Sequence, residues 1–158
     1  MKLVGSLVMG VGALMCITLF TVERAYAGEN DRPIKCTLET LNGQYLVAGN
    51  GMLIPPVPLF SIPAGVPPSV TAVAAYSIYN GDGTGTDYVT FTVDGVIAAN
   101  GPTPTTYTLN TDCTGTRTVV NGPHFNIFVA IDGSALTEVS TDQGFAVSTF
   151  DRRAGSER

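Results

Sequence analysis

The chain has 158 residues, of which 8 are basic and 13 acidic, and it contains one histidine and no tryptophan. This length suits a single domain that is large enough to bury a hydrophobic core. The acidic balance and the scattered Lys and Arg residues argue against nucleic acid and anionic membrane surfaces as partners, because phosphate binding needs clustered basic side chains. We expect no metal and no organic cofactor, since the sequence has no metal-type cysteine cluster.

The N-terminus has the features of an export signal. Lys2 precedes a long apolar run, and Ala25 and Ala27 form the small-x-small pattern that a signal peptidase recognises. We expect cleavage after Ala27, which gives a signal peptide over residues 1–27 and one domain over residues 28–158. An uncleaved membrane anchor is the alternative, because the run approaches the roughly 20 residues that span a bilayer. The mature protein is expected to be secreted or periplasmic, without a stable membrane anchor.

The cysteine count supports this compartment. Removal of Cys16 with the signal leaves Cys36 and Cys113. An even pair in an oxidising compartment predicts a structural disulfide. The alternative, a redox dithiol, lacks the Cys-x-x-Cys spacing.

The body of the chain consists of short segments rich in Val, Ile, Thr, Tyr and Phe, separated by Gly, Asn, Asp and Pro. These compositions are typical of strands and tight turns, and no mature segment has the periodicity of a helix. Eight strands are predicted. They cover residues 43–53, 71–79, 87–97, 105–110, 113–121, 124–131, 135–141 and 145–151.

The connections between several of these strands are short. Residues 80–85, 132–134 and 142–144 supply the glycine and aspartate that tight hairpins need for positive φ. Strands joined in this way are antiparallel neighbours, which predicts an up-and-down meander. Eight such strands close most simply into an antiparallel β-barrel, because closure removes exposed edges. An open β-sandwich is the alternative.

One segment between the first two strands is both proline-rich and apolar. It begins at Ile54, ends at Pro68 and holds six of the ten prolines. The prolines predict a stiff extended loop, and the apolar side chains require burial. We expect this loop to pack on the barrel wall, to close the mouth of the barrel, or to dock on another subunit as part of a homo-oligomer.

Alternation along the strands predicts which side chains face the interior. In the third strand Val89, Phe91 and Val93 share one face and are expected to fill the barrel. The sixth strand has two apolar faces, because Phe128 lies opposite the face that holds Phe125. We therefore expect another segment to cover the outside of that strand.

Two features resemble catalytic or metal sites only in part. The oxygen-bearing residues between Asn80 and Asp87 alternate as in a calcium loop, but the twelfth position is Phe91, where an EF-hand requires glutamate. A glycine-rich hairpin explains the same residues. His124 follows a Gly-Pro turn and is expected to be exposed, and the chain has no Gly-x-Ser-x-Gly motif.

Arg117 and Glu138 are charged residues within predicted strands. The simpler expectation is that both side chains point to water. If they face inward, they must be paired or bind a polar ligand group, because burial of an unpaired charge costs several kcal/mol. Glu138 would then serve as an acid or base beside a hydrophobic ligand.

Four motifs extend over nearly the whole mature chain. They are C-x4-L-x-G-x-Y from Cys36, N-G-D-G-T-G from Asn80, Y-T-L-N-x-D-C-T-G-T from Tyr107 and T-D-x-G from Thr141. The set resembles small exported bacterial proteins of unassigned role, which are similar to calycin-type barrels such as the lipocalins and the allene oxide cyclase and dirigent group. The resemblance implies the fold, because its motifs are turns and a disulfide. No segment matches a catalytic pattern of those cyclases.

The function predicted from these features is the binding of a small apolar ligand, or a role as an interaction module. An eight-stranded barrel either holds one small ligand or is filled by its own side chains, and a cavity above roughly 300 Å³ would favour a ligand. The alternatives are a cofactor-free cyclase or isomerase, and a structural subunit that assembles through the proline-rich loop. The residues expected to contact a ligand are Tyr45, Phe91, Arg117, Phe125 and Glu138.

Overall fold

The structure is a computed structural model that describes residues 35–155. The predicted signal peptide, its cleavage site and Cys16 lie outside these residues. The described residues form two short 3-10 helices and eight strands. These are η1 (Leu38–Thr40), β1 (Asn42–Leu53), η2 (Pro58–Phe60), β2 (Ser69–Asn80), β3 (Thr84–Val93), β4 (Val96–Leu109), β5 (Thr114–Val119), β6 (His124–Val129), β7 (Ala135–Ser140) and β8 (Phe145–Arg153). No helix within the described range is long and apolar enough to cross a membrane.

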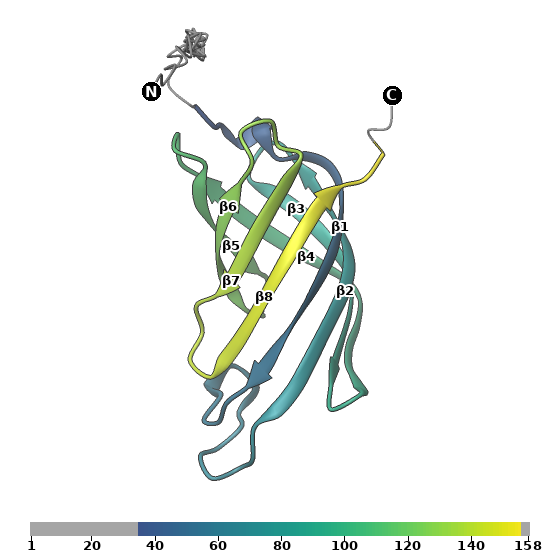
Figure 1. Ribbon diagram of the computed structural model, residues 1–158, viewed down its shortest axis with the longest axis vertical. Helices are drawn as coiled ribbons and strands as arrows, with labels where there is room; N and C mark the ends of the chain where they lie inside the picture. The colour runs from purple at the N-terminus through teal and green to yellow at the C-terminus, as the bar shows by residue number, and fades with distance from the viewer. Residues whose placement is uncertain (1–34, 156–158) are drawn as a thin grey trace, which may run out of the picture. The chain divides into compact units, whose positions relative to one another are not determined.

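The eight strands form a closed antiparallel barrel in which each strand pairs with the next one in the sequence (Figure 1). Closure is made by β1 and β8, whose paired positions run from Tyr45 opposite Arg153 to Leu53 opposite Phe145. This architecture confirms the predicted up-and-down barrel and excludes the open sandwich. A closed ring is favourable because it leaves no strand edge unpaired along the contact.

The third and fourth strands are divided differently from the prediction. β3 ends at Val93, and Asp94 and Gly95 take positive φ angles of 47° and 81° in a two-residue hairpin. This geometry is that of an Asp-Gly turn, which matches the right-handed twist of its flanking strands. The sequence interpretation missed it because the apolar residues that follow continue the strand composition.

β4 consequently begins at Val96, well before the predicted start at residue 105, and contains two prolines. Pro102 and Pro104 pair with Tyr88 and Thr86 of β3, whereas the pairing of β4 with β5 starts only at Thr105. The proline half of β4 therefore has a partner strand on one side alone, and proline is tolerated at such an edge.

One end of the barrel is closed by aromatic side chains and the disulfide. Tyr79 lies edge-on to both Tyr45 and Tyr107, with ring centroids 5.3 Å apart in each pair. Cys36 and Cys113 form the predicted disulfide, with their Cα atoms 5.0 Å apart. It ties the segment before η1 to the turn between β4 and β5.

The proline-rich loop lies at the opposite end (Figure 1). Val57 is completely buried, and the ring of Phe60 packs against Phe145 and Phe91 with centroid separations of 5.5 and 6.5 Å. The loop was expected either to pack on the barrel wall or to close the barrel mouth. In the structure it lies at the mouth. Leu59 and Ile62 also pack against the core, whereas Ile54 and Val66 are 48% and 44% exposed, so the expected burial of the apolar side chains of this loop holds only in part.

The burial of side chains on β3 and β6 agrees only in part with the prediction made from alternation. Val89 and Phe91 face the interior, as does Phe125. Phe128, on the outer face of β6, is 53% exposed. The expectation that another segment covers this strand is therefore wrong for the described residues, because the proline-rich loop packs on the end of the barrel instead.

Candidate functional site

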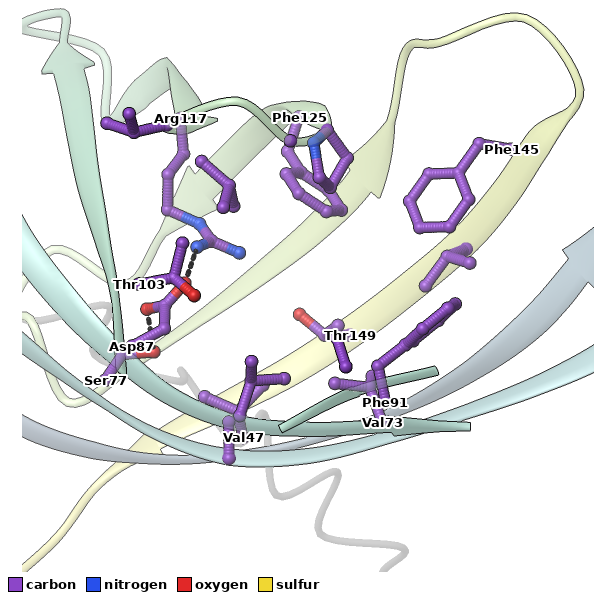
Figure 2. Close-up of a pocket in the computed structure, with 18 of the residues that line it drawn as sticks. Val47, Val73, Ser77, Asp87, Phe91, Thr103, Arg117, Phe125, Phe145 and Thr149 are labelled. Carbon is purple, nitrogen blue, oxygen red and sulfur yellow. Dashed lines mark hydrogen bonds and ion pairs between the residues drawn. The ribbon is translucent and has the colours of Figure 1, made fainter. Parts of the chain in front are cut away.

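A cavity of about 250 Å³ lies inside the barrel beneath the proline-rich loop (Figure 2). Most of its wall is apolar. The apolar lining includes Val47, Val73, Val89, Phe91, Phe125 and Phe145. The volume is slightly below the roughly 300 Å³ typical of ligand sites, but it exceeds the ~150 Å³ of an apolar cavity known to hold benzene. The space therefore suits a molecule built on a single ring.

On β3 and β8 the inward side chains change from apolar to polar with depth. On β3 the order from the mouth inward is Phe91, Val89 and Asp87, and β8 runs from Phe145 to Thr149 and Asp151. Because inward positions alternate along a strand, this order places an apolar chamber above a polar floor.

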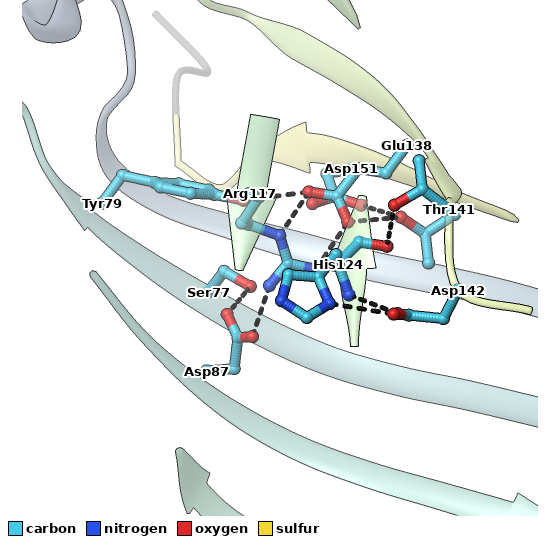
Figure 3. A network of polar contacts seen from close by, with 10 residues as sticks. Ser77, Tyr79, Asp87, Arg117, His124, Glu138, Thr141, Asp142 and Asp151 are labelled. Atoms are coloured by element: carbon cyan, nitrogen blue, oxygen red, sulfur yellow. Dashed lines mark hydrogen bonds and ion pairs between the residues drawn. The ribbon is translucent and has the colours of Figure 1, made fainter. Parts of the chain in front are cut away.

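Arg117 and Glu138 form the centre of this floor (Figure 3). Nε and Nη2 of Arg117 donate to Oε1 and Oε2 of Glu138 over 2.6 and 2.5 Å, and Nη1 donates to Oδ2 of Asp87 over 2.6 Å. Both members of the pair are buried. The expectation that Arg117 and Glu138 face water is therefore wrong: a two-point carboxylate partner compensates the buried guanidinium. The Arg117 guanidinium carbon also lies 4.8 Å from the centroid of the Phe125 ring.

Further hydrogen bonds extend from the ion pairs. The Ser77 hydroxyl donates to Oδ1 of Asp87 over 2.6 Å, and the Tyr79 hydroxyl donates to Oε1 of Glu138 over 3.3 Å. Burial and the charge of Glu138 raise the pKa of Tyr79 well above its usual value. Burial alone would lower the pKa of Arg117, but its acidic neighbours raise it well above the usual value. The guanidinium therefore stays charged at any pH at which the protein is folded.

Asp151 lies at the deepest point of the network and is completely buried. Burial, reinforced by the nearby charge of Glu138, raises the pKa of Asp151 to about 8, so its carboxyl carries a proton at neutral pH. The Thr149 hydroxyl lies 2.9 Å from Oδ1 of Asp151 and 3.3 Å from Oε2 of Glu138. A hydroxyl has one proton and cannot donate to both. The Thr149 proton therefore serves either Asp151 or Glu138, and the hydroxyl connects these two carboxyl groups.

The floor carries an excess of negative charge. The Arg117 cation faces the carboxylates of both Asp87 and Glu138, and protonated Asp151 adds no charge. One guanidinium against two carboxylates leaves net negative charge on the floor whether Asp151 is protonated or ionised, in surroundings where charge is poorly screened.

The structure brings three of the five predicted ligand-contact residues to the cavity. Phe91, Arg117 and Phe125 line it. Glu138 lies behind Arg117 and does not line the cavity. Tyr45 lies in the closed end, where its hydroxyl donates to the carbonyl oxygen of Gly133 over 2.5 Å.

Sequence reasoning missed the polar side chains of the floor. Asp87 shares the inward face of β3 with Val89 and Phe91, and the same alternation that placed those two inside would have found it. Thr149 and Asp151 follow the inward Val147 of β8 in the same way.

The segment that resembles a calcium loop and the single histidine both lie on the surface of the barrel. His124 is exposed as expected, and its Nδ1 lies 2.9 Å from Oδ1 of Asp142, outside the cavity. In the hairpin after Asn80, Oδ1 of Asp82 accepts hydrogen bonds from the backbone and the hydroxyl of Thr84. These bonds lower the pKa of Asp82 and define a turn. Within residues 35–155 no group of three or more His, Cys, Asp or Glu side chains is placed to hold a metal ion.

No protein-family model matches the chain, and comparisons with curated proteins and with solved structures find no similar protein. The class that the fold and the site define is therefore a disulfide-tied antiparallel barrel with an internal, mainly apolar cavity.

Proposed function

We propose that this protein is a secreted or periplasmic barrel that binds a small apolar molecule in its internal cavity. The observation that carries the proposal is the apolar chamber beneath Phe60, in a barrel whose other end is filled by tyrosines. An apolar wall of this kind gains dispersion contacts when an apolar molecule packs against it. The resemblance to calycin-type barrels supports the same class by analogy, and the disulfide suits an oxidising compartment.

Binding is favoured over catalysis by the arrangement of the carboxylates. A cyclase or isomerase of this kind needs an acid or base that reaches the substrate. Glu138, the residue expected in that role, is separated from the cavity by Arg117. Asp87 does line the cavity, where its ion pair with Arg117 and its hydrogen bond from Ser77 hold it as a hydrogen-bond acceptor for a bound molecule.

Toluene tests the proposal because it is a single apolar ring without a polar group. Ala75 lines the cavity, whereas its neighbour Ala74 points out of the barrel. Titration calorimetry is expected to show toluene binding to the wild-type protein and to Ala74→Phe, and no binding to Ala75→Phe, whose ring fills the chamber. Equal binding by both variants, or no binding to the wild type, would contradict the proposal.

The natural ligand is accessible by native mass spectrometry of protein purified from its producer, followed by denaturing extraction. A retained small molecule is expected as added mass that disappears on denaturation. The same spectrum reports the mass of the mature chain and its oligomeric state, which tests the predicted cleavage after Ala27 and the alternative of a homo-oligomeric subunit.

A further inference from the structure

We infer, resting on the proposed function, that the cavity selects a neutral molecule carrying a hydroxyl group, an alcohol or a phenol, over an anion or a cation of the same size. The polar floor carries this inference, because it presents a hydrogen-bond donor and a hydrogen-bond acceptor side by side. Figure 2 shows Arg117 and Asp87 together at one side of the apolar lining.

Arg117 supplies the donor. A guanidinium has five N–H hydrogens, and three are taken up by the bonds to Glu138 and Asp87. Among the described residues the two others, one on each Nη, form no hydrogen bond. Because Arg117 lines the cavity, a ligand oxygen is a suitable partner for them.

Asp87 supplies the acceptor. Each carboxylate oxygen can accept about two hydrogen bonds, and each oxygen of Asp87 accepts one, from Ser77 and from Arg117. One acceptor site therefore remains on each oxygen, and the site on Oδ2 lies next to the guanidinium, since the ion pair measures 2.6 Å. Thr149 also lines the cavity, but its only proton is already engaged by a carboxyl oxygen of Asp151 or Glu138.

A hydroxyl group is the simplest head group that satisfies both sides, because it donates one hydrogen bond and accepts two. A carboxylate accepts only and would face the Asp87 anion in a floor that already has net negative charge. An ammonium donates only, so it cannot accept from the free N–H groups of Arg117, and repulsion by that cation offsets the attraction of the net negative charge of the floor. Either ion would also lose its hydration on entry, which costs more than the desolvation of a neutral hydroxyl.

Four ligands that share a methyl-substituted ring test this inference at pH 7. They are toluene, 4-methylphenol, 4-methylbenzoate and 4-methylbenzylammonium. Calorimetric titration of the wild-type protein is expected to show that 4-methylphenol binds about tenfold tighter than toluene, a modest gain for hydrogen bonds to charged groups. Both ions are expected to bind at least about tenfold more weakly than 4-methylphenol.

The outcomes separate the two proposals. Toluene binding without a preference for 4-methylphenol overturns this inference and leaves the proposed function standing. Tightest binding of either ion also overturns the inference alone. No binding of any ligand overturns the proposed function and, with it, the inference.

The substitution Asp87→Asn tests whether Asp87 causes the preference for 4-methylphenol over toluene. Asp142→Asn, on the surface, is the matched control. The amide introduced by Asp87→Asn keeps the shape of the carboxylate but removes its charge. The preference for 4-methylphenol over toluene is therefore expected to shrink to less than about threefold, while 4-methylbenzoate gains affinity. Asp142→Asn is expected to keep the wild-type order. An unchanged preference in a folded Asp87→Asn protein, verified by circular dichroism, overturns the assignment. If that variant does not fold, the four wild-type titrations still decide.

Discussion

Arg117 of β5 and Glu138 of β7 meet in a two-point ion pair although β6 lies between their strands. The pair therefore reaches across β6 on the inner face of the barrel, and it depends on the register of all three strands. A buried ion pair of this kind contributes little net stability compared with apolar side chains, but loss of one partner is costly because the other charge remains buried.

Arg117→Met is expected to lower the free energy of unfolding by about 3–5 kcal/mol, because Asp87 and Glu138 would be left without their cation. Urea unfolding followed by circular dichroism measures this change. Arg152→Met, on the exposed face of β8, is the control and is expected to change stability by less than about 0.5 kcal/mol. Similar effects of the two substitutions would show that the cluster does not need its cation.

Asp151→Asn is expected to make the protein more stable than the wild type, by a margin that grows with pH. The unfolded chain releases the Asp151 proton near the usual pKa of 3.8, whereas the folded chain keeps it up to about pH 8. Between these values the unfolded state binds fewer protons, so wild-type stability falls as pH rises. The difference between variant and wild type should increase by up to about 1.4 kcal/mol per pH unit between pH 5 and pH 8.

Urea unfolding of both proteins at several pH values checks this expectation. The comparison isolates Asp151, because Asp87, Glu138 and Arg117 around it are unchanged. A difference that stays constant from pH 5 to pH 8 would mean that Asp151 is ionised in the folded protein.

Loss of the disulfide is expected to cost about 4 to 4.5 kcal/mol on the chain-entropy account, since the bond links residues 77 positions apart. The double substitution Cys36→Ala/Cys113→Ala tests this by urea unfolding. The wild-type protein in dithiothreitol should match the double variant, and the variant itself should not respond to dithiothreitol. A loss below about 1 kcal/mol would contradict the chain-entropy account for this bond.

Phe60→Ala is expected to open the cavity mouth. The variant loses two aromatic contacts, with Phe91 and Phe145, and we expect stability to fall by about 1–2 kcal/mol while toluene dissociates faster. Phe128→Ala, on the outer face of β6, should leave the dissociation rate unchanged. NMR exchange measurements on both variants give these rates, and equal rates would show that ligands enter elsewhere.

Much of the fold was predictable from local patterns. The turns at 132–134 and 142–144 and the alternation of β6 are local signals, and the strands beside them lie within a few residues of their predicted limits. The error at Asp94 has a local cause as well, because apolar residues on both sides hid a two-residue turn. Closure by β1 and β8 followed from general reasoning about edges, since no local pattern encodes it.

The site was less predictable because it depends on contacts between distant strands. Phe91 and Phe125 were found from alternation alone. The inward direction of Arg117 becomes favourable only when Glu138 and Asp87 are brought to it from other strands. The spacing of these three residues in the sequence does not predict that they come into contact. A charged residue considered alone is expected to be exposed to water.

The pairing of β1 with β8 also determines what a shortened chain would do. A polypeptide that stops before Phe145 has two unpaired strand edges, one on β1 and one on β7. Each edge exposes backbone N–H and C=O groups that can pair with a strand of another molecule. Such a fragment is expected to exchange strands with its neighbours or to precipitate. The last nine-residue strand is thus what keeps this protein from polymerising.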